Sequence, residues 1–140
     1  MKQLLFLLLA INLYASEFEI KCMAMAIYFE SRGSNLADQA AVTDVIMNRV
    51  ESRKFPNTIC EVVKQRHQFS FFWDGKSDRM RNTDAAASAY LLAYQVINYK
   101  RFRGITEGSD HYHAIYVKPY WIKSFNLVGK IGKHIYYKSN

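Results

Sequence analysis

One carboxylate in this sequence stands where it could act as a general acid. Glu30 follows an apolar run, residues 22–29, and Gly33, a residue typical of helix ends, comes three positions later. On a helix, Glu30 extends a stripe that contains Ile20 and Ile27, so its carboxyl is expected at the edge of a core. Loss of hydration there raises the pKa of a carboxyl, and the negative end of the helix dipole acts in the same direction. A carboxyl that keeps its proton near neutral pH is the acid that glycosidases commonly use.

Glu30 also has a plainer interpretation. A glutamate at a helix end can pair with a neighbouring cation such as Arg32 and contribute only to solubility. Two other acids, Asp38 and Asp44, are interpreted as a helix-start residue and a surface residue, so neither is assigned as a nucleophile. Glu30 is therefore the candidate catalytic residue, with the solubility role as the alternative.

A second candidate region is the aromatic segment 68–73. Alternation on a strand would place Gln68 and Ser70 on one face, while Phe69 and two further rings lie on the other. An amide and a hydroxyl beside aromatic rings could hydrogen-bond sugar hydroxyls and N-acetyl groups. The alternative is an ordinary half-buried strand.

Histidines form the third candidate group. His111 and His113 would share one face of a strand, with His134 following later, and Glu30 or Asp110 could complete a metal site. The sequence contains no HExxH pattern, and a bare His-x-His is weak evidence for a metal. We therefore expect histidines that hydrogen-bond near a cleft, with no metal and no cofactor.

The elements that would position these residues follow from periodicity and capping signals. Helices are predicted at 17–31, at 36–52 after the cap Asn35, from Thr58 to about 65, and at 85–99 after Thr83 or Asp84. The last third is predicted to hold an extended segment at 111–117 and a strand pair within 128–137. No repeats or linkers interrupt the chain, so we predict one α+β domain, mostly helical.

The first fifteen residues are typical of a signal peptide rather than of the domain. Residues 1–15 have a short positive start, an apolar run too short to span a bilayer, and Ala15 before the expected cleavage point. Residues 16–140 would form the domain, secreted across the inner membrane to the periplasm or cell wall without stable membrane insertion. An uncleaved anchor is the alternative. Secretion would allow Cys22 and Cys60, the two cysteines, to form a disulfide instead of staying free and buried.

The charge balance indicates an anionic partner. Nineteen Lys and Arg against twelve Asp and Glu give a formal net charge of +7. An anionic wall or envelope surface suits this charge, as nucleic acid also would, but the secreted character favours the wall and no nucleic acid. The lysines of the tail are spaced singly among apolar residues and are expected on a solvated face: Lys118, Lys123, Lys130, Lys133 and Lys138.

Taken together, these segments resemble the SleB-type cell wall hydrolases, which include spore-cortex-lytic enzymes. The matching segments are residues 26–33, 39–50, 55–59, 68–70, 111–114 and 131–136. They occur in the order found in the family and span nearly all of the expected mature chain.

The resemblance implies a lysozyme-like domain that cleaves the β-1,4 bond between N-acetylmuramic acid and N-acetylglucosamine in peptidoglycan. It implies that Glu30 is the catalytic acid and that Ser70 helps to position substrate. The other candidate substrate-binding residues are Gln68, Phe69, Tyr112, His113 and Trp121. The family often carries a second glutamate directly after the glycine, where this chain has Ser34, so a role for that second acid does not carry over.

A single well-placed acid favours a lytic transglycosylase. Hydrolysing glycosidases need two carboxyls at defined separations. A transglycosylase needs one, because the muramic 6-hydroxyl closes a 1,6-anhydro ring and no water has to be activated. Three alternatives stay open: a muramidase that adds water, a non-catalytic peptidoglycan-binding protein, and a metal-dependent nuclease that uses His111 and His113.

Overall fold

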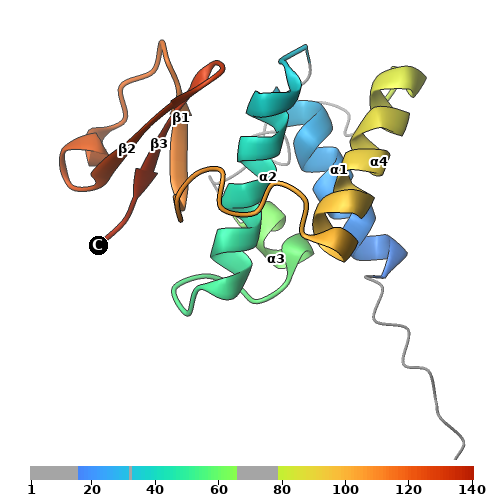
Figure 1. Cartoon of the computed structure of the whole chain (residues 1–140), viewed down its shortest axis with the longest axis horizontal. Helices are drawn as coiled ribbons and strands as arrows, with labels where there is room; N and C mark the ends of the chain where they lie inside the picture. The colour runs from blue at the N-terminus through green and yellow to red at the C-terminus, as the bar shows by residue number, and fades with distance from the viewer. Residues whose placement is uncertain (1–15, 32, 66–78) are drawn as a thin grey trace, which may run out of the picture.

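A computed structural model describes residues 16–31, 33–65 and 79–140. Its elements are α1 (Glu17–Ser31), α2 (Leu36–Glu51), α3 (Ile59–Lys64), α4 (Thr83–Tyr99), β1 (His111–Ala114), the 3-10 helix η2 (Tyr120–Lys123), β2 (Asn126–Ile131) and β3 (His134–Lys138). Figure 1 shows the small sheet on one side of α2, with α1 and α4 on the other side. The predicted α+β fold, mostly helical with a small β element, is confirmed.

The helix starts follow local capping chemistry. Asn35 accepts the backbone N–H of Asp38, and Thr58 accepts that of Glu61, as the sequence predicts for α2 and α3. The start of α4 was predicted wrongly, because Asn82 rather than Thr83 or Asp84 is the cap and accepts from Ala85. Three consecutive residues of cap-forming type made the choice ambiguous from sequence.

Two faces of α2 serve two cores. Val42 and Ile46 pack with α1, α3 and α4 in the main helical core, which also contains Ile27 of α1. Ala41 and Val45 lie one position earlier in each turn and pack against the fully buried Tyr136 of β3. Because residues four apart share a helix face, this spacing lets α2 join the helices to the sheet.

The sheet has the order β1-β3-β2, with both pairs antiparallel. The predicted closing strand pair is confirmed as β2 and β3. The predicted extended segment 111–117 is too long, because β1 ends at Ala114, where the carbonyl accepts the N–H of Val117 in a turn. No helix among residues 16–31, 33–65 and 79–140 is long and apolar enough to cross a bilayer.

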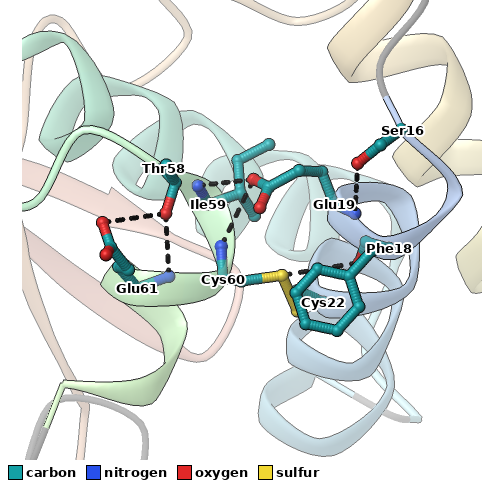
Figure 2. The surroundings of a disulfide bond; sticks show 8 residues. All are labelled: Ser16, Phe18, Glu19, Cys22, Thr58, Ile59, Cys60 and Glu61. Atoms are coloured by element: carbon teal, nitrogen blue, oxygen red, sulfur yellow. Dashed lines mark hydrogen bonds between the residues drawn. A yellow bond between two sulfur atoms is a disulfide. The ribbon is translucent and has the colours of Figure 1, made fainter.

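A disulfide joins α1 to α3. Cys22 and Cys60 are bonded, and Figure 2 shows that Glu19, one turn earlier on α1, points to the same end of α3. Its carboxylate accepts the N–H groups of Ile59 (2.7 Å) and Cys60 (3.3 Å). This acid at a helix N-terminus satisfies donors that have no partner within the helix.

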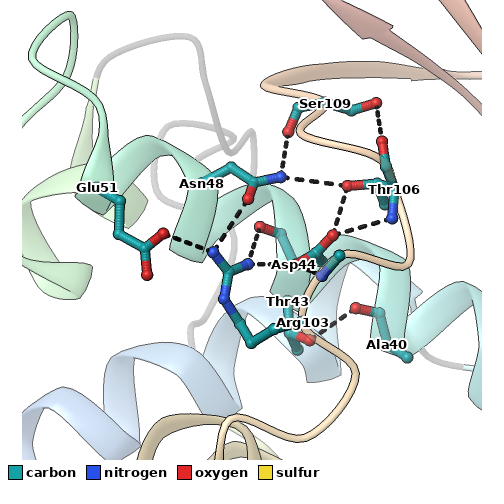
Figure 3. Close-up of polar contacts among 9 residues, drawn as sticks. Ala40, Thr43, Asp44, Asn48, Glu51, Arg103, Thr106 and Ser109 are labelled. Carbon is teal, nitrogen blue, oxygen red and sulfur yellow. Dashed lines mark hydrogen bonds and ion pairs between the residues drawn. The ribbon is translucent and has the colours of Figure 1, made fainter.

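A buried carboxylate on α2 fixes the chain that leads into β1. Asp44, 1% exposed, pairs with Arg103 and accepts the N–H of Gly104 and both donors of Thr106, as Figure 3 shows. Asn48, one turn later, donates to the carbonyl of Ser109 at 2.8 Å. The surface position expected for Asp44 is therefore wrong, because this residue is buried. Its partners lie about sixty positions further along the chain, so no local pattern predicts them.

Candidate active site

One cavity of about 750 Å³ brings together residues from the helices and the sheet. Its walls come from the end of α1, from α2, from β1, from the chain between β1 and β2, and from the start of β3. The lining residues are Phe29, Glu30, Arg49, His111, Tyr112, His113, Ala114, Tyr116, Val117, Pro119, Tyr120, Trp121, Phe125 and His134. This volume is within the range of small-ligand sites.

Glu30 lies at the edge of the helical core, as its position on the apolar stripe predicts. The residues before it, Ala26, Ile27 and Tyr28, are buried, while Glu30 itself is partly exposed and lines the cavity. It is the only carboxylate among the described lining residues. That the pKa of Glu30 is raised stays a prediction from its position.

Tyr112 lies near enough to Glu30 for the two side chains to interact electrostatically. Burial raises the pKa of Tyr112 well above its usual value, and the negative charge of Glu30 raises it further. Its hydroxyl is buried and makes no hydrogen bond with any described residue. Tyr112 is therefore a neutral phenol, with its hydroxyl buried, near the candidate acid.

His113 lines the cavity, but both of its ring nitrogens are engaged within the protein. Nδ1 donates to the carbonyl of Ala114 at 2.7 Å, and Nε2 accepts from the hydroxyl of Tyr137 at 3.0 Å. Its ring also stacks on Tyr137, with centroids 5.4 Å apart. His113 therefore stabilises the cavity wall. Neither of its ring nitrogens is free to make the direct substrate contact that the sequence predicts.

Trp121 anchors the outer wall of the cavity. Its ring packs against His111, His113 and Tyr137, with centroid distances of 5.2, 5.8 and 5.3 Å. The neighbouring Tyr120 is 94% exposed and lines the same cavity. Trp121 therefore holds the short helix η2 against the sheet, and Tyr120 of the same helix exposes its ring to solvent.

Two further histidines, each paired with an aspartate, complete the site. His134 Nδ1 donates to Asp38 Oδ1 at 2.7 Å, and His111 Nδ1 donates to Asp110 Oδ1 at 3.0 Å. Asp38 lies on the first turn of α2, as its interpretation as a helix-start residue predicts, and it is fully buried. The partner of Asp38 lies 96 positions away, and no local signal identifies it.

Arg49 of α2 supports the same wall. It is 3% exposed, its Nε donates to the carbonyl of Asp110 at 2.7 Å, and its guanidinium lies 4.9 Å from the ring centroid of Phe55. Burial lowers its pKa, while the charge of Asp110 acts in the opposite direction. Arg49 thus ties the helical layer to the start of β1 beneath the cavity.

The structure therefore gathers Glu30, Tyr112, His113 and Trp121 around one cavity, as the sequence predicts for a shared site. Gln68, Phe69 and Ser70 lie outside the described residues. Within the described chain, no three His, Cys, Asp or Glu residues are grouped so that they could hold a metal ion.

A model of the family described as Cell Wall Hydrolase matches residues 33–137. The chain belongs to the cell wall hydrolase family. Glu30 lies just before the matched range, so its role rests on the cavity and on the motif.

Curated relatives of this cell wall hydrolase include the spore cortex-lytic enzymes of Bacillus cereus and Bacillus subtilis. The first is 32% identical over 129 residues, covering 88% of this chain and 45% of the relative. The second is 31% identical over 121 residues, covering 86% of this chain and 38% of the relative. The chain thus spans less than half the length of these relatives.

Two solved structures share the fold of this cell wall hydrolase. The catalytic domain of the germination-specific lytic transglycosylase SleB from Bacillus anthracis has a TM-score of 0.72 and 34% identity, covering 89% of this chain and 97% of that one. The catalytic domain of the Bacillus cereus SleB protein has a TM-score of 0.70 and 35% identity, covering 88% and 91%. The resemblance stated from sequence is confirmed.

Proposed function

We propose that this cell wall hydrolase is a peptidoglycan glycosidase that cleaves glycan strands with Glu30 as its general acid. The observation that carries the proposal is the position of Glu30, partly buried at the end of α1 and facing a cavity lined by aromatic rings and imidazoles. The solved relative at 34% identity is described as a lytic transglycosylase, which supports the same chemistry here.

The reaction favoured by this arrangement is lytic transglycosylation. Glu30 protonates the glycosidic oxygen as the bond from that oxygen to the muramic C1 breaks. The muramic 6-hydroxyl then bonds to C1, and its proton passes to the Glu30 carboxylate, so the acid is regenerated and no water is consumed. General acid–base catalysis by Glu30 would contribute a factor of about 10²–10⁴.

The other carboxylates near the cavity are already engaged. Asp38 holds His134, and Asp110 holds His111 and the backbone N–H of Ser139. A hydrolysing glycosidase would need a second carboxylate facing the sugar. The absence of one among the described lining residues supports transglycosylation over a muramidase reaction.

The surrounding residues suit an amino-sugar substrate. The exposed ring of Tyr120 offers a stacking surface next to Trp121. Substrate positioning by Gln68, Phe69 and Ser70 stays a prediction. The five tail lysines are all exposed, which supports attraction to an anionic wall or envelope surface.

Secretion is part of the proposal. Removal of residues 1–15 would deliver residues 16–140 to the periplasm or cell wall, where peptidoglycan and disulfide-forming conditions coincide. N-terminal sequencing of the protein recovered outside the cytoplasm would test this: Ser16 at the start supports it, and an intact Met1 contradicts it.

Mass spectrometry of soluble fragments from purified sacculi tests the reaction. A lytic transglycosylase yields 1,6-anhydro products, which are lighter by one water than the products of a muramidase. Products that have reducing ends and no anhydro rings would show that the reaction is hydrolysis and not transglycosylation. Binding to sacculi without release of fragments would instead indicate a non-catalytic wall-binding protein.

A further inference from the structure

Two histidines that line the cavity, His111 and His134, are each paired with an aspartate, and neither is used by the reaction assigned to Glu30. Asp110 precedes β1 and holds His111, while Asp38 on the first turn of α2 holds His134 on β3. Tyr112 lies between them in the fold, because it follows His111 in sequence and its ring contacts the ring of His134, with centroids 5.0 Å apart.

The carboxylates determine which ring nitrogen carries the proton. Hydrogen bonds from His111 and Ser139 outweigh the effect of burial and lower the pKa of Asp110 to about 2, so this group is an anion that can only accept. Asp38 is fully buried, and its Oδ1 faces His134 Nδ1. A carboxylate bound to Nδ1 keeps the proton there, which leaves Nε2 of the neutral ring as an acceptor.

Both Nε2 atoms are open to the cavity. Neither Nε2 atom hydrogen-bonds to a described residue, and neither is fully buried. His113, on the same strand as His111, differs because Tyr137 occupies its Nε2. The cavity thus presents two open imidazole acceptors and one closed imidazole.

We propose that His111 and His134 are substrate-binding residues whose Nε2 atoms accept hydrogen bonds from O–H or N–H groups of the amino sugars bound beside Glu30. This inference rests on the proposed function and deepens it. Hydroxyl and acetamido groups supply the donors that such acceptors require.

The two acceptors are held rigidly before any ligand arrives. Asp110 also accepts the backbone N–H of Ser139 at 2.8 Å. The turn before β3 closes tightly over Asp38, since a Cβ added at Gly132 would lie 2.6 Å from the Asp38 Cβ. Because the rings are already oriented, little rotamer freedom is lost on binding.

The same pairs resemble the outer shell of a metal site, in which a carboxylate orients a ligating imidazole. The described residues, however, bring no third His, Cys, Asp or Glu into a group with them. The sugar interpretation is therefore favoured, and metal binding becomes an outcome that the test can detect.

Nitrogen NMR of the imidazoles in a Glu30→Gln protein tests the proposal without turnover. The free protein should show His111 and His134 protonated at Nδ1, and soluble glycan fragments from sacculi should shift both Nε2 signals. Protonation at Nε2 in the free protein, or unmoved Nε2 signals when backbone signals report saturation, would overturn the assignment. Zinc bound at submicromolar concentration by the two rings, with no glycan response, would also overturn it.

Paired substitutions measure the contribution of each acceptor in the same background. His134→Asn keeps an N–H for Asp38 but removes the acceptor, so sacculus binding should weaken about 2- to 10-fold. His134→Gln can place an amide oxygen near the Nε2 position, so its affinity for sacculi should be closer to that of the Glu30→Gln parent. The same pair applies to His111. Equal binding by the Asn and parent proteins would contradict this inference alone, whereas no sacculus binding by the parent would contradict the proposed function as well.

Discussion

The Oδ1 atom of Asp38 lies 2.7 Å from the Nδ1 atom of His134, joining residues 96 positions apart. This contact attaches the first turn of α2 to the first residue of β3, and it turns one edge of the His134 ring toward the cavity that contains Glu30. The register between the helical layer and the sheet therefore also sets the geometry of the site.

Gly132→Ala should weaken this contact and destabilise the fold. Gly132 has φ +57°, and an added Cβ would lie 2.6 Å from Asp38 Cβ, so backbone strain and a clash act together. We expect a loss of about 1–3 kcal/mol in the free energy of unfolding, measured by urea denaturation. Gly129→Ala is the matched control, because nothing lies within 4 Å of its added Cβ. Equal effects of the two substitutions would contradict the prediction.

Asp44→Ala should be strongly destabilising. It would leave Arg103 and the donors of residues 104 and 106 without their buried acceptor (Figure 3), so we expect a loss of about 3–5 kcal/mol. Glu51 pairs with the same arginine but is 61% exposed, and Glu51→Gln should change stability by at most about 1 kcal/mol. Thermal and urea unfolding of both variants would check the contrast, which a loss below 1 kcal/mol for Asp44→Ala would refute.

Acid should destabilise the protein partly through Asp110. Its pKa is lowered from 3.8 to about 2 in the folded state, so its stabilising contribution is complete above about pH 4 and is lost as the pH falls through 2. Urea denaturation between pH 5 and pH 2 should show a steeper loss for the wild type than for Asp110→Asn, by no more than about 2 kcal/mol. Parallel profiles would show that Asp110 does not contribute this dependence.

Tyr120→Ala should weaken glycan binding with little effect on folding. Tyr120 is 94% exposed at the cavity rim, so its ring contributes little to the core but can stack on a sugar face. Pelleting with sacculi in the Glu30→Gln background should show about 2- to 10-fold weaker binding. Tyr99→Ala is the control, since Tyr99 is 64% exposed on α4 and is not a cavity residue. Equal binding by both variants would remove Tyr120 from the site.

Much of the fold could be predicted from sequence, because the contacts that determine it are local. The caps Asn35 and Thr58 act within three residues of their partners, so the starts of α2 and α3 could be predicted. The apolar stripe before Glu30 likewise predicted a carboxyl at the edge of a core. In each case the decisive contact lies within one or two helical turns of the residue concerned.

The buried polar contacts could not be predicted in this way. The sequence pattern marks Asp38 as a helix-start acid and Asp44 as a surface acid, and only the tertiary fold brings His134 and Arg103 to them. The difference between the open nitrogen of His134 and the closed ring of His113 depends on one hydroxyl, that of Tyr137, across the sheet. Such pairings depend on strand register, which the sequence pattern left undefined.

The account depends most on Glu30 as the proton donor, and release of soluble fragments from purified sacculi by the Glu30→Gln protein tests it most directly. The variant should unfold at the same temperature as the wild type, bind sacculi, and release fragments at least about 100-fold more slowly. A correctly folded Glu30→Gln protein that releases fragments at the wild-type rate would contradict the assignment.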